Sequence, residues 1–166
     1  MEVIMRTAVQ TDVSEISRLA LELSLQHQKY DDLRFYLPED FQKQAADLFV
    51  QEIADPNCAV LVAEDDGQIL GYAFIRWEAA SLIELSDART WLHDIYVSKS
   101  ARGGGIGKTL LEYAIVTARA MGSSVLMLQV AEKNEFAQKL FARHNFRTTM
   151  YEMTLDLSEA NAVPKS

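Results

Sequence analysis

The stretch Ala101-Arg102-Gly103-Gly104-Gly105-Ile106-Gly107-Lys108-Thr109 carries four glycines within five positions and joins two segments of different hydrophobic pattern. The segment before it, Thr90–Val97, is rich in aromatic and branched residues, which predicts a strand. The segment after it, Ile106–Met121, has apolar residues at helical spacing. A strand that leads through a glycine turn into a helix N-terminus favours anion binding, because unpaired backbone N–H groups and the helix dipole converge there.

The end of this loop, Gly107-Lys108-Thr109, looks like the end of the nucleotide-binding P-loop, G-x-x-x-x-G-K-[ST]. A P-loop needs glycine where this chain has Arg102, whose side chain restricts the turning backbone. It also needs a metal-holding Asp on another buried strand, and the downstream candidate, Val125–Val130, contains none. Nucleotide binding is therefore the weaker alternative. A plain tight turn is also disfavoured, because so many glycines cost much unfolded-state entropy.

Length, composition and charge limit the possible domain organisation, location and partners. The chain has 166 residues, 49% of them hydrophobic, which predicts one domain over residues 1–157 and a frayed polar tail at 158–166. The sequence shows neither a signal peptide nor 18 consecutive apolar residues, so we expect a cytoplasmic protein without a membrane partner. The net charge of −8 disfavours binding to nucleic acid and suits a cationic partner.

Cysteine and histidine give little sign of metal or thiol chemistry. The single cysteine, Cys58, precedes the apolar run Ala59–Ala63, which favours a buried structural thiol over a nucleophile. The histidines at 27, 93 and 144 lie far apart and lack metal-ligand spacing. We therefore expect no metal.

Hydrophobic periodicity and turn signals predict the order of elements β-α-α-β-β-β-α-β-α-β. This order indicates an α/β fold, a mixed sheet with helices on both faces. The expected strands are residues 2–8, 59–64, 68–77, 90–97 and 124–131, with one or two more within 146–157. The first expected helix starts at residue 11 or 12 and ends near residue 27, and the others span residues 38–53, 106–121 and 134–143.

Two blocks of sequence carry a family resemblance. Residues 92–111 read LHDIYVSKSARGGGIGKTLL, and residues 134–146 read NEFAQKLFARHNF. They resemble the GNAT N-acetyltransferase superfamily, whose signature is [Q/R]-x-x-G-x-[G/A] after a strand reading roughly L-Y-V, followed by N-x-x-A-x-x-L-Y-x-x-x-G-F. The blocks stand in family order, and the predicted elements match the family over nearly the whole chain. The resemblance implies a mostly antiparallel central sheet and acetyl-CoA as co-substrate.

The resemblance also implies where acetyl-CoA would bind. Its pyrophosphate would lie on the amides of the glycine loop, its pantetheine arm would run beside the preceding strand where strand 124–131 splays away, and the second block would pack against the arm. The implied cofactor-binding residues are Ile95, Tyr96, Val97, Arg102, Gly103, Gly104, Gly105, Ile106, Gly107, Lys108, Asn134, Ala137 and Phe141.

The implied reaction, attack of an amine on the thioester carbonyl, needs a base. An alkyl ammonium with a pKa near 10.4 leaves only about one amine in a thousand neutral at pH 7.4. The catalytic candidates are His93, which occupies the position of a catalytic histidine in serotonin N-acetyltransferases, and Asp94. Strand alternation places them on opposite faces unless the strand bulges. A hydrogen-bonded strand histidine without a catalytic role remains the alternative for His93.

Two departures from the family pattern leave a second function open. Gln129 stands where ribosomal-type peptide acetyltransferases carry a Glu, and Phe141 stands where the family usually has a Tyr that protonates the leaving thiolate. Asn145 replaces a usual Gly, a mild change because Asn accepts positive φ. A catalytically silent acyl-CoA-binding or sensor domain is therefore the alternative.

The acceptor site should be formed by residues 28–40 and 78–90. Their carboxylates and aromatic rings suit a small cationic amine, through ion pairs and cation–π contacts. A peptide or protein amino group, or an ordinary solvated surface, remains open. The acidic and aromatic residues expected at the acceptor site are Tyr30, Asp31, Asp32, Phe35, Tyr36, Glu39, Asp40, Trp77, Glu78, Glu84, Asp87 and Trp91. We thus expect acetyl-CoA and an amine acceptor as partners and leave open whether the chain forms a homodimer.

Overall fold

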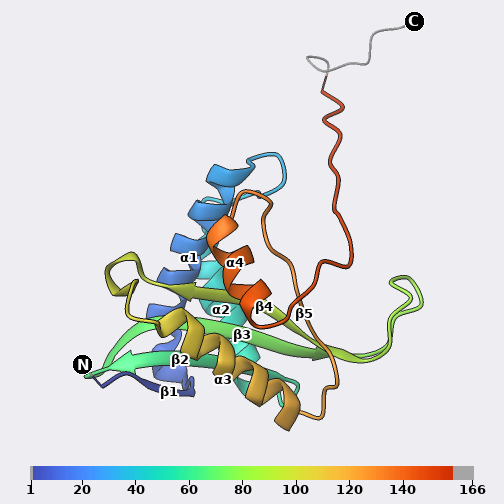
Figure 1. Cartoon of the computed structure of the whole chain (residues 1–166). Helices are drawn as coiled ribbons and strands as arrows, with labels where there is room; N and C mark the ends of the chain where they lie inside the picture. The colour runs from blue at the N-terminus through green and yellow to red at the C-terminus, as the bar shows by residue number, and fades with distance from the viewer. Residues whose placement is uncertain (1, 159–166) are drawn as a thin grey trace, which may run out of the picture.

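The computed structural model describes residues 2–158, whose strands form a five-stranded sheet in the order β1-β2-β3-β4-β5 (Figure 1). Neighbouring strands from β1 to β4 pair antiparallel, and β5 pairs parallel with β4. The predicted mixed, mostly antiparallel sheet is confirmed. The strands are β1 (Ile4–Thr7), β2 (Cys58–Asp65), β3 (Gln68–Glu78), β4 (Arg89–Val97) and β5 (Leu126–Leu128), and the helices are α1 (Val13–Tyr30), α2 (Phe41–Ala54), α3 (Ile106–Ala120) and α4 (Glu135–Arg143).

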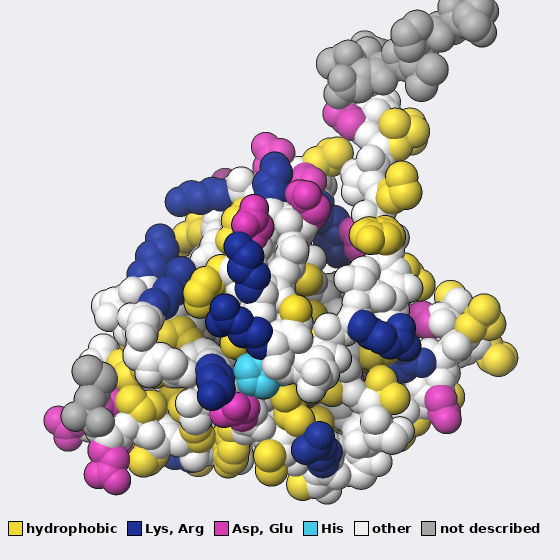
Figure 2. Space-filling model, viewed as in Figure 1, with side chains coloured by type: hydrophobic (Ala, Val, Ile, Leu, Met, Phe, Trp, Pro, Cys, Tyr) yellow, Lys and Arg dark blue, Asp and Glu magenta, His cyan; other side chains and the backbone are white. Residues whose placement is uncertain are grey.

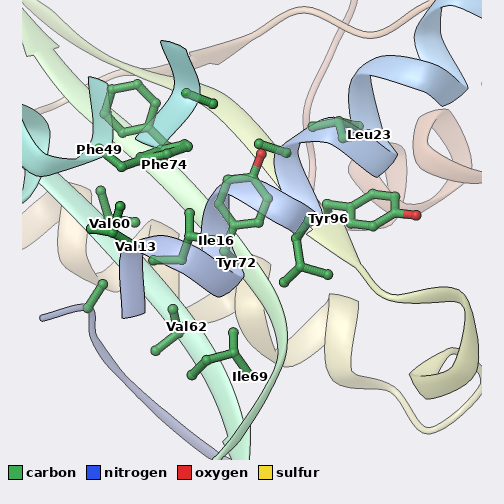
Figure 3. Close-up of a cluster of buried hydrophobic side chains, with 14 residues drawn as sticks. Val13, Ile16, Leu23, Phe49, Val60, Val62, Ile69, Tyr72, Phe74 and Tyr96 are labelled. Atoms are coloured by element: carbon green, nitrogen blue, oxygen red, sulfur yellow. The ribbon is translucent and has the colours of Figure 1, made fainter. Parts of the chain in front are cut away.

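Helices cover both faces of the sheet, as predicted. Val60 and Val62 of β2 face α1 and α2, where they lie in one core with Phe49 (Figure 3). Leu61 lies between them in the chain and belongs to the core of the opposite face, with Leu110 of α3. This division follows from the period of two along a strand, which sends successive side chains to opposite faces.

Local turn signals set several boundaries. The β2–β3 hairpin turns through Asp66 and Gly67, whose φ angles are 49° and 78°, in agreement with the Asp-Gly signal. Asn145 ends α4 with a φ of 65°, so Asn does adopt the conformation for which glycine is usual. Helix α1 continues to Tyr30, beyond the predicted end near His27, because the residues that follow contain no early Gly or Pro.

The C-terminal part differs from the prediction. The expected strand 124–131 is reduced to Leu126–Leu128, which is only half-buried. The strands expected within 146–157 are wrong, because those residues are described and none is assigned to a strand. A strand requires a hydrogen-bonded neighbour, and in this structure residues 147–157, called the arm below, extend away from the body instead (Figure 1). Of the predicted tail at 158–166, all but Ser158 lies outside the described residues.

Candidate functional site

The glycine loop, residues 98–105, connects the end of β4 to the start of α3. Gly103 and Gly105 have φ angles of 94° and 79°, so the backbone itself requires glycine there. Gly104 and Gly107 have no such angle; a Cβ at Gly104 would meet nothing within 4 Å, and one at Gly107 would touch only Val97, at 3.6 Å. Neither strain nor packing therefore requires glycine at these two positions. Their absent side chains leave room for a group outside the protein to approach the backbone.

The start of α3 presents unpaired amides beside this loop. The first helical backbone hydrogen bond of α3 runs from the amide of Thr109 to the carbonyl of Gly105, at 3.1 Å. The amides of Ile106, Gly107 and Lys108 precede it, and α-helical geometry offers them no acceptor. Ile106 is buried and ties the helix start to the sheet. These amides are the kind of backbone donors that the predicted anion site requires.

Basic side chains surround this site in an otherwise acidic protein. Figure 2 shows Lys and Arg side chains gathered over α3, α4 and the loop that precedes α3. A cationic face on a chain with a net charge of −8 concentrates anions locally. The exposed cations of these elements are Lys99, Arg102, Lys108, Arg119, Lys139 and Arg143.

Arg102 lies over the end of β4. Its Nε donates to the carbonyl of Val97 at 3.0 Å, and its guanidinium carbon lies 5.1 Å from the centre of the Tyr96 ring. Tyr96 is buried, and its hydroxyl donates to Glu22 of α1 at 3.1 Å. Burial and this hydrogen bond raise the pKa of Tyr96. The Tyr96 side chain therefore belongs to the α1 face, and only its backbone can serve a ligand on the β5 side.

The predicted parting of β4 and β5 is present. Their register joins Thr90 to Leu126 and ends at Leu92 with Leu128, so the stretch 93–97 of β4 has no partner in β5. The backbone of Ile95 and Val97 lies in this unpaired stretch. Such a free edge can bind an extended ligand that carries amide groups.

The second sequence block forms α4. The side-chain oxygen of Asn134 accepts from the amide of Ala137 at 3.3 Å and caps the helix. Phe141 is only 6% exposed and stacks at a tilt on Phe146, 5.7 Å between ring centres. Phe141 is thus part of the core under α4, and its ring offers no hydroxyl for proton transfer.

β4 contains a bulge, the exception under which His93 and Asp94 need not face opposite sides of the sheet. Phe74 of β3 pairs with Asp94, and the next residue, Ile75, pairs with Leu92, so His93 is an extra residue in the strand. Both side chains then reach the α1–α2 face: the His93 ring stacks on Phe74 at 5.2 Å, and Asp94 accepts from the Tyr72 hydroxyl at 2.8 Å. A bulge re-aims side chains in this way and is common beside active sites.

Asp94 is partly buried and bonded to the Tyr72 hydroxyl. Burial raises the pKa of its carboxyl, while the hydrogen bond from Tyr72 opposes the shift. His27, at the last turn of α1, is close enough to interact with Asp94 electrostatically, and burial lowers the pKa of His27. The site therefore gathers titratable groups from β3, β4 and α1.

We predict that Asp94→Asn stabilises the protein at neutral pH. Because the folded pKa of Asp94 lies above its usual value of 3.8, the cost of its charge is absent below that pH and grows as pH rises through the folded pKa. We expect a gain in Tm of a few degrees at pH 7, since 1 kcal/mol gives about 2–4 °C in a protein of this size, and a smaller gain near pH 4.

The matched control for this prediction is Tyr72→Phe. It removes the donor that stabilises the Asp94 carboxylate, so it should lower the Tm more at pH 7 than at pH 4. Calorimetric melts of both variants across this pH range decide the matter. A lower Tm for Asp94→Asn at pH 7 would contradict the prediction.

His93 lies on the open side of the same group. Its Nε2 lies 3.1 Å from a carboxylate oxygen of Glu78, and its ring also stacks with Trp91 at 6.4 Å. Phe35, from the loop after α1, joins the group by stacking on His27 at 4.8 Å. One expected acceptor segment thus contributes the Glu78 carboxylate to this group, and the other contributes the Phe35 ring.

Other residues expected at the acceptor site lie elsewhere. Trp77 lines a shallow hollow with Pro56, Asn57 and Met121. Glu84 and Asp87 belong to the β3–β4 connection, away from the helices (Figure 1). Asp31 accepts from the amides of its own loop.

Sequence reasoning missed two residues of the site, His27 and Tyr72. Neither shows a local signal, because His27 occurs in an amphipathic helix and Tyr72 within an apolar strand. The only hint available for His27 was its place in the last turn of a helix, which would face the site if that helix ended near the glycine loop.

A second cluster, on β2, β3 and α2, is satisfied by protein groups. Glu52, Asp55 and Cys58 offer ligand atoms within 4.8 Å of one another. The Arg76 guanidinium bonds Glu52 at 2.7 Å and Asp55 at 2.9 Å, so a cation already occupies the cluster. Burial and the Glu52 carboxylate raise the pKa of Cys58 to about 12, which leaves its thiol unreactive near neutrality.

Comparison with known proteins identifies the relatives of this fold and loop. The model of the acetyltransferase (GNAT) family matches residues 27–146. An uncharacterized N-acetyltransferase of Mycobacterium tuberculosis is 31% identical over 99 residues, which are 60% of this chain and 59% of that protein. The chain therefore spans less than two thirds of the length of that relative. No helix within residues 2–158 is long and apolar enough to cross a membrane.

Solved structures share the architecture over almost the whole chain. A tetramutant of the BH1408 protein of Bacillus halodurans superimposes with a TM-score of 0.80 at 26% identity, covering 93% of this chain and 99% of that one. A predicted acetyltransferase of Clostridium acetobutylicum, solved with acetyl-CoA, gives a TM-score of 0.74 at 17% identity, covering 95% and 98%. At that identity the second likeness concerns the fold alone.

Proposed function

Because the chain belongs to the acetyltransferase (GNAT) family, we propose that it transfers the acetyl group of acetyl-CoA to a primary amine. The observation that carries the proposal is the glycine loop: Gly104 and Gly107 have no structural need of glycine, and they lie beside the free amides at the start of α3. A diphosphate requires this clearance and this set of donors.

Acetyl-CoA would lie along the path that the free backbone groups define. The diphosphate would accept from the amides of residues 103–108, with the exposed cations of the loop and α3 around it. The pantetheine arm would pair with the stretch 93–97 of β4, which has no partner in β5. The Val97 carbonyl, which now accepts from Arg102, would then accept from the pantetheine arm. The thioester would then reach the bulge at His93.

The reaction would be a direct transfer. The amine nitrogen attacks the thioester carbonyl, the C–N bond forms, the C–S bond breaks, and coenzyme A leaves as a thiolate. His93 would accept one proton from the ammonium before the attack, directly or through one water, and Glu78 would orient its imidazole. The second proton, which the nitrogen loses as the amide forms, would pass to solvent. Phe141 offers no acid, but a thiol with a pKa of about 8.5 is a tolerable leaving group without one.

We propose a small cationic amine as the acceptor. The group around His93 combines the Glu78 carboxylate with the rings of Phe74 and Trp91, which attract an ammonium before its deprotonation. A peptide or protein amino group is the alternative within the same chemistry.

The deciding experiment measures thiol release from acetyl-CoA against a panel of small diamines, aminoglycosides, amino acids and short peptides. We expect release with at least one cationic small amine, and saturation with that amine. Tight acetyl-CoA binding without turnover by any amine would favour a silent sensor domain. Tight magnesium–ATP binding with indifference to CoA would overturn the proposal altogether.

A further inference from the structure

The proposed transfer releases a thiolate that needs a proton. A thiol with a pKa of about 8.5 is mostly protonated at neutral pH, so the sulfur of coenzyme A takes up a proton as it departs or soon afterwards. Phe141 lies in the core beneath α4 and has no hydroxyl to supply this proton. A side chain that donates to the sulfur within the site must therefore be another residue.

Tyr30, the last residue of α1, lies where the two halves of the candidate site meet. On the acceptor side, its ring is 6.1 Å from the ring of His27, which interacts electrostatically with Asp94. On the coenzyme side, its carbonyl accepts from the Lys133 ammonium at 2.6 Å, next to Asn134 at the start of α4 (Figure 1). The thioester belongs at this junction, because its sulfur ends the coenzyme path and its carbonyl meets the amine.

The hydroxyl of Tyr30 accepts a hydrogen bond and keeps its own hydrogen. Gln26, one turn earlier in α1, donates from its side-chain amide to the Tyr30 hydroxyl oxygen at 3.0 Å. The Gln26 side-chain oxygen accepts from Arg102 at 3.2 Å, and because a guanidinium only donates, the amide nitrogen must face Tyr30. Among residues 2–158, no protein group accepts the hydrogen of the Tyr30 hydroxyl. That hydrogen is available to a ligand.

Each of the other five tyrosines is placed differently. Two are buried on the α1 face and donate their hydroxyls to carboxylates, at 2.8 and 3.1 Å. Two are 84% and 85% exposed, and one packs against the core of the α3 face. They are, in this order, Tyr72 and Tyr96, Tyr36 and Tyr151, and Tyr113. Within the described part of the chain, Tyr30 alone combines a hydrogen left to donate with contacts to both halves of the site.

We propose that Tyr30 donates its phenolic proton to the sulfur of coenzyme A as the acetyl group leaves. The C–N bond forms, the C–S bond breaks, and the departing thiolate takes the Tyr30 proton and becomes a thiol. The Tyr30 oxygen is then a phenolate, which the amide of Gln26 stabilises through the existing hydrogen bond. It recovers a proton from the solvent, which receives the one that the nitrogen loses. This role rests on the proposed acetyl transfer and adds a catalytic residue to it.

The first test needs no turnover. The thiol of bound CoA is titrated by the difference in ultraviolet absorbance between the complex and its free components, since a thiolate absorbs where a thiol does not. A hydrogen bond from Tyr30 stabilises the thiolate, so we expect the apparent pKa of the bound thiol to be about one pH unit higher in Tyr30→Phe than in the wild type. Tyr151→Phe, on the exposed arm, is the matched control and should match the wild type.

The second test follows kcat with the preferred amine from pH 6.5 to 9.5. At pH 7 a thiol is favoured over its thiolate by about 30-fold, so Tyr30→Phe should lower kcat by up to about that factor. The loss should shrink above pH 8.5, where the thiolate needs no proton. A structural role for the ring would instead lower kcat by one factor at every pH. Tyr113→Phe and Tyr151→Phe should keep the wild-type profile.

The outcomes separate this role from the transfer itself. Calorimetry with CoA and a thermal melt first establish that each variant binds and is folded. If CoA binds and its thiol titrates alike in Tyr30→Phe and the wild type, or if the loss of kcat is the same at every pH, Tyr30 is not the proton donor, and the transfer stands. A larger pH-dependent loss in Tyr113→Phe would assign the role to that residue and overturn the proposal. A folded wild type that does not bind CoA would overturn the transfer and this role together.

Discussion

Gly104→Glu should abolish binding of coenzyme A while the protein stays folded. Gly104 has no positive φ, and a Cβ there would meet no protein atom within 4 Å, so we expect the fold to tolerate the substitution. The new carboxylate would instead stand where the diphosphate approaches the amides. Loss of two charge-assisted hydrogen bonds, at about 1.5–3 kcal/mol each, corresponds to a dissociation constant raised at least ~100-fold.

Titration calorimetry with CoA, together with a thermal melt, measures both halves of this prediction. Gly104→Gln is the matched control, because it adds the same bulk without the charge and should weaken binding less. Gly105 is the poorer position for the test, since its φ of 79° would strain any side chain. If a folded Gly104→Glu protein binds CoA with normal affinity, the glycine loop is not part of the CoA site.

His93→Ala should lower kcat/KM with the preferred amine by about 100-fold or more and leave CoA affinity unchanged. The imidazole stands at the bulge of β4, partly exposed and bonded to Glu78, where it can take a proton from an incoming ammonium. Coenzyme A would contact the loop amides and not His93, so its dissociation constant should be the same in the variant as in the wild type. The lower limb of the pH–rate profile should flatten in the variant.

Glu78→Gln distinguishes catalysis by His93 from a structural role. The amide can still bond the imidazole and hold it in place, so the rate should fall less than in His93→Ala. If His93→Ala keeps both its rate and its pH limb, the base is another group. Asp94 is then the first candidate, since the bulge places it on the same face as His93.

The sequence by itself determined the glycine loop and what surrounds it. Positive φ at Gly103 and Gly105, the turn at Asp66–Gly67 and the helical spacing of α3 depend on neighbouring residues in the chain, so they can be read locally. The same holds for the alternation that divides Val60 and Leu61 between two cores. Local conformational preference and periodicity therefore sufficed for the fold class, while anion binding at the loop stays a prediction.

The tertiary structure decided what depends on partners far apart in the chain. The bulge at His93 arises from the register between β3 and β4, and it places Asp94 on the same face as His93. The contacts of Asp94 with Tyr72 and His27 join residues 22 and 67 positions away, which no spacing rule connects. The arm has a strand pattern, but a strand forms only where backbone groups find partners, and within residues 2–158 of one chain the arm pairs with none in a ladder.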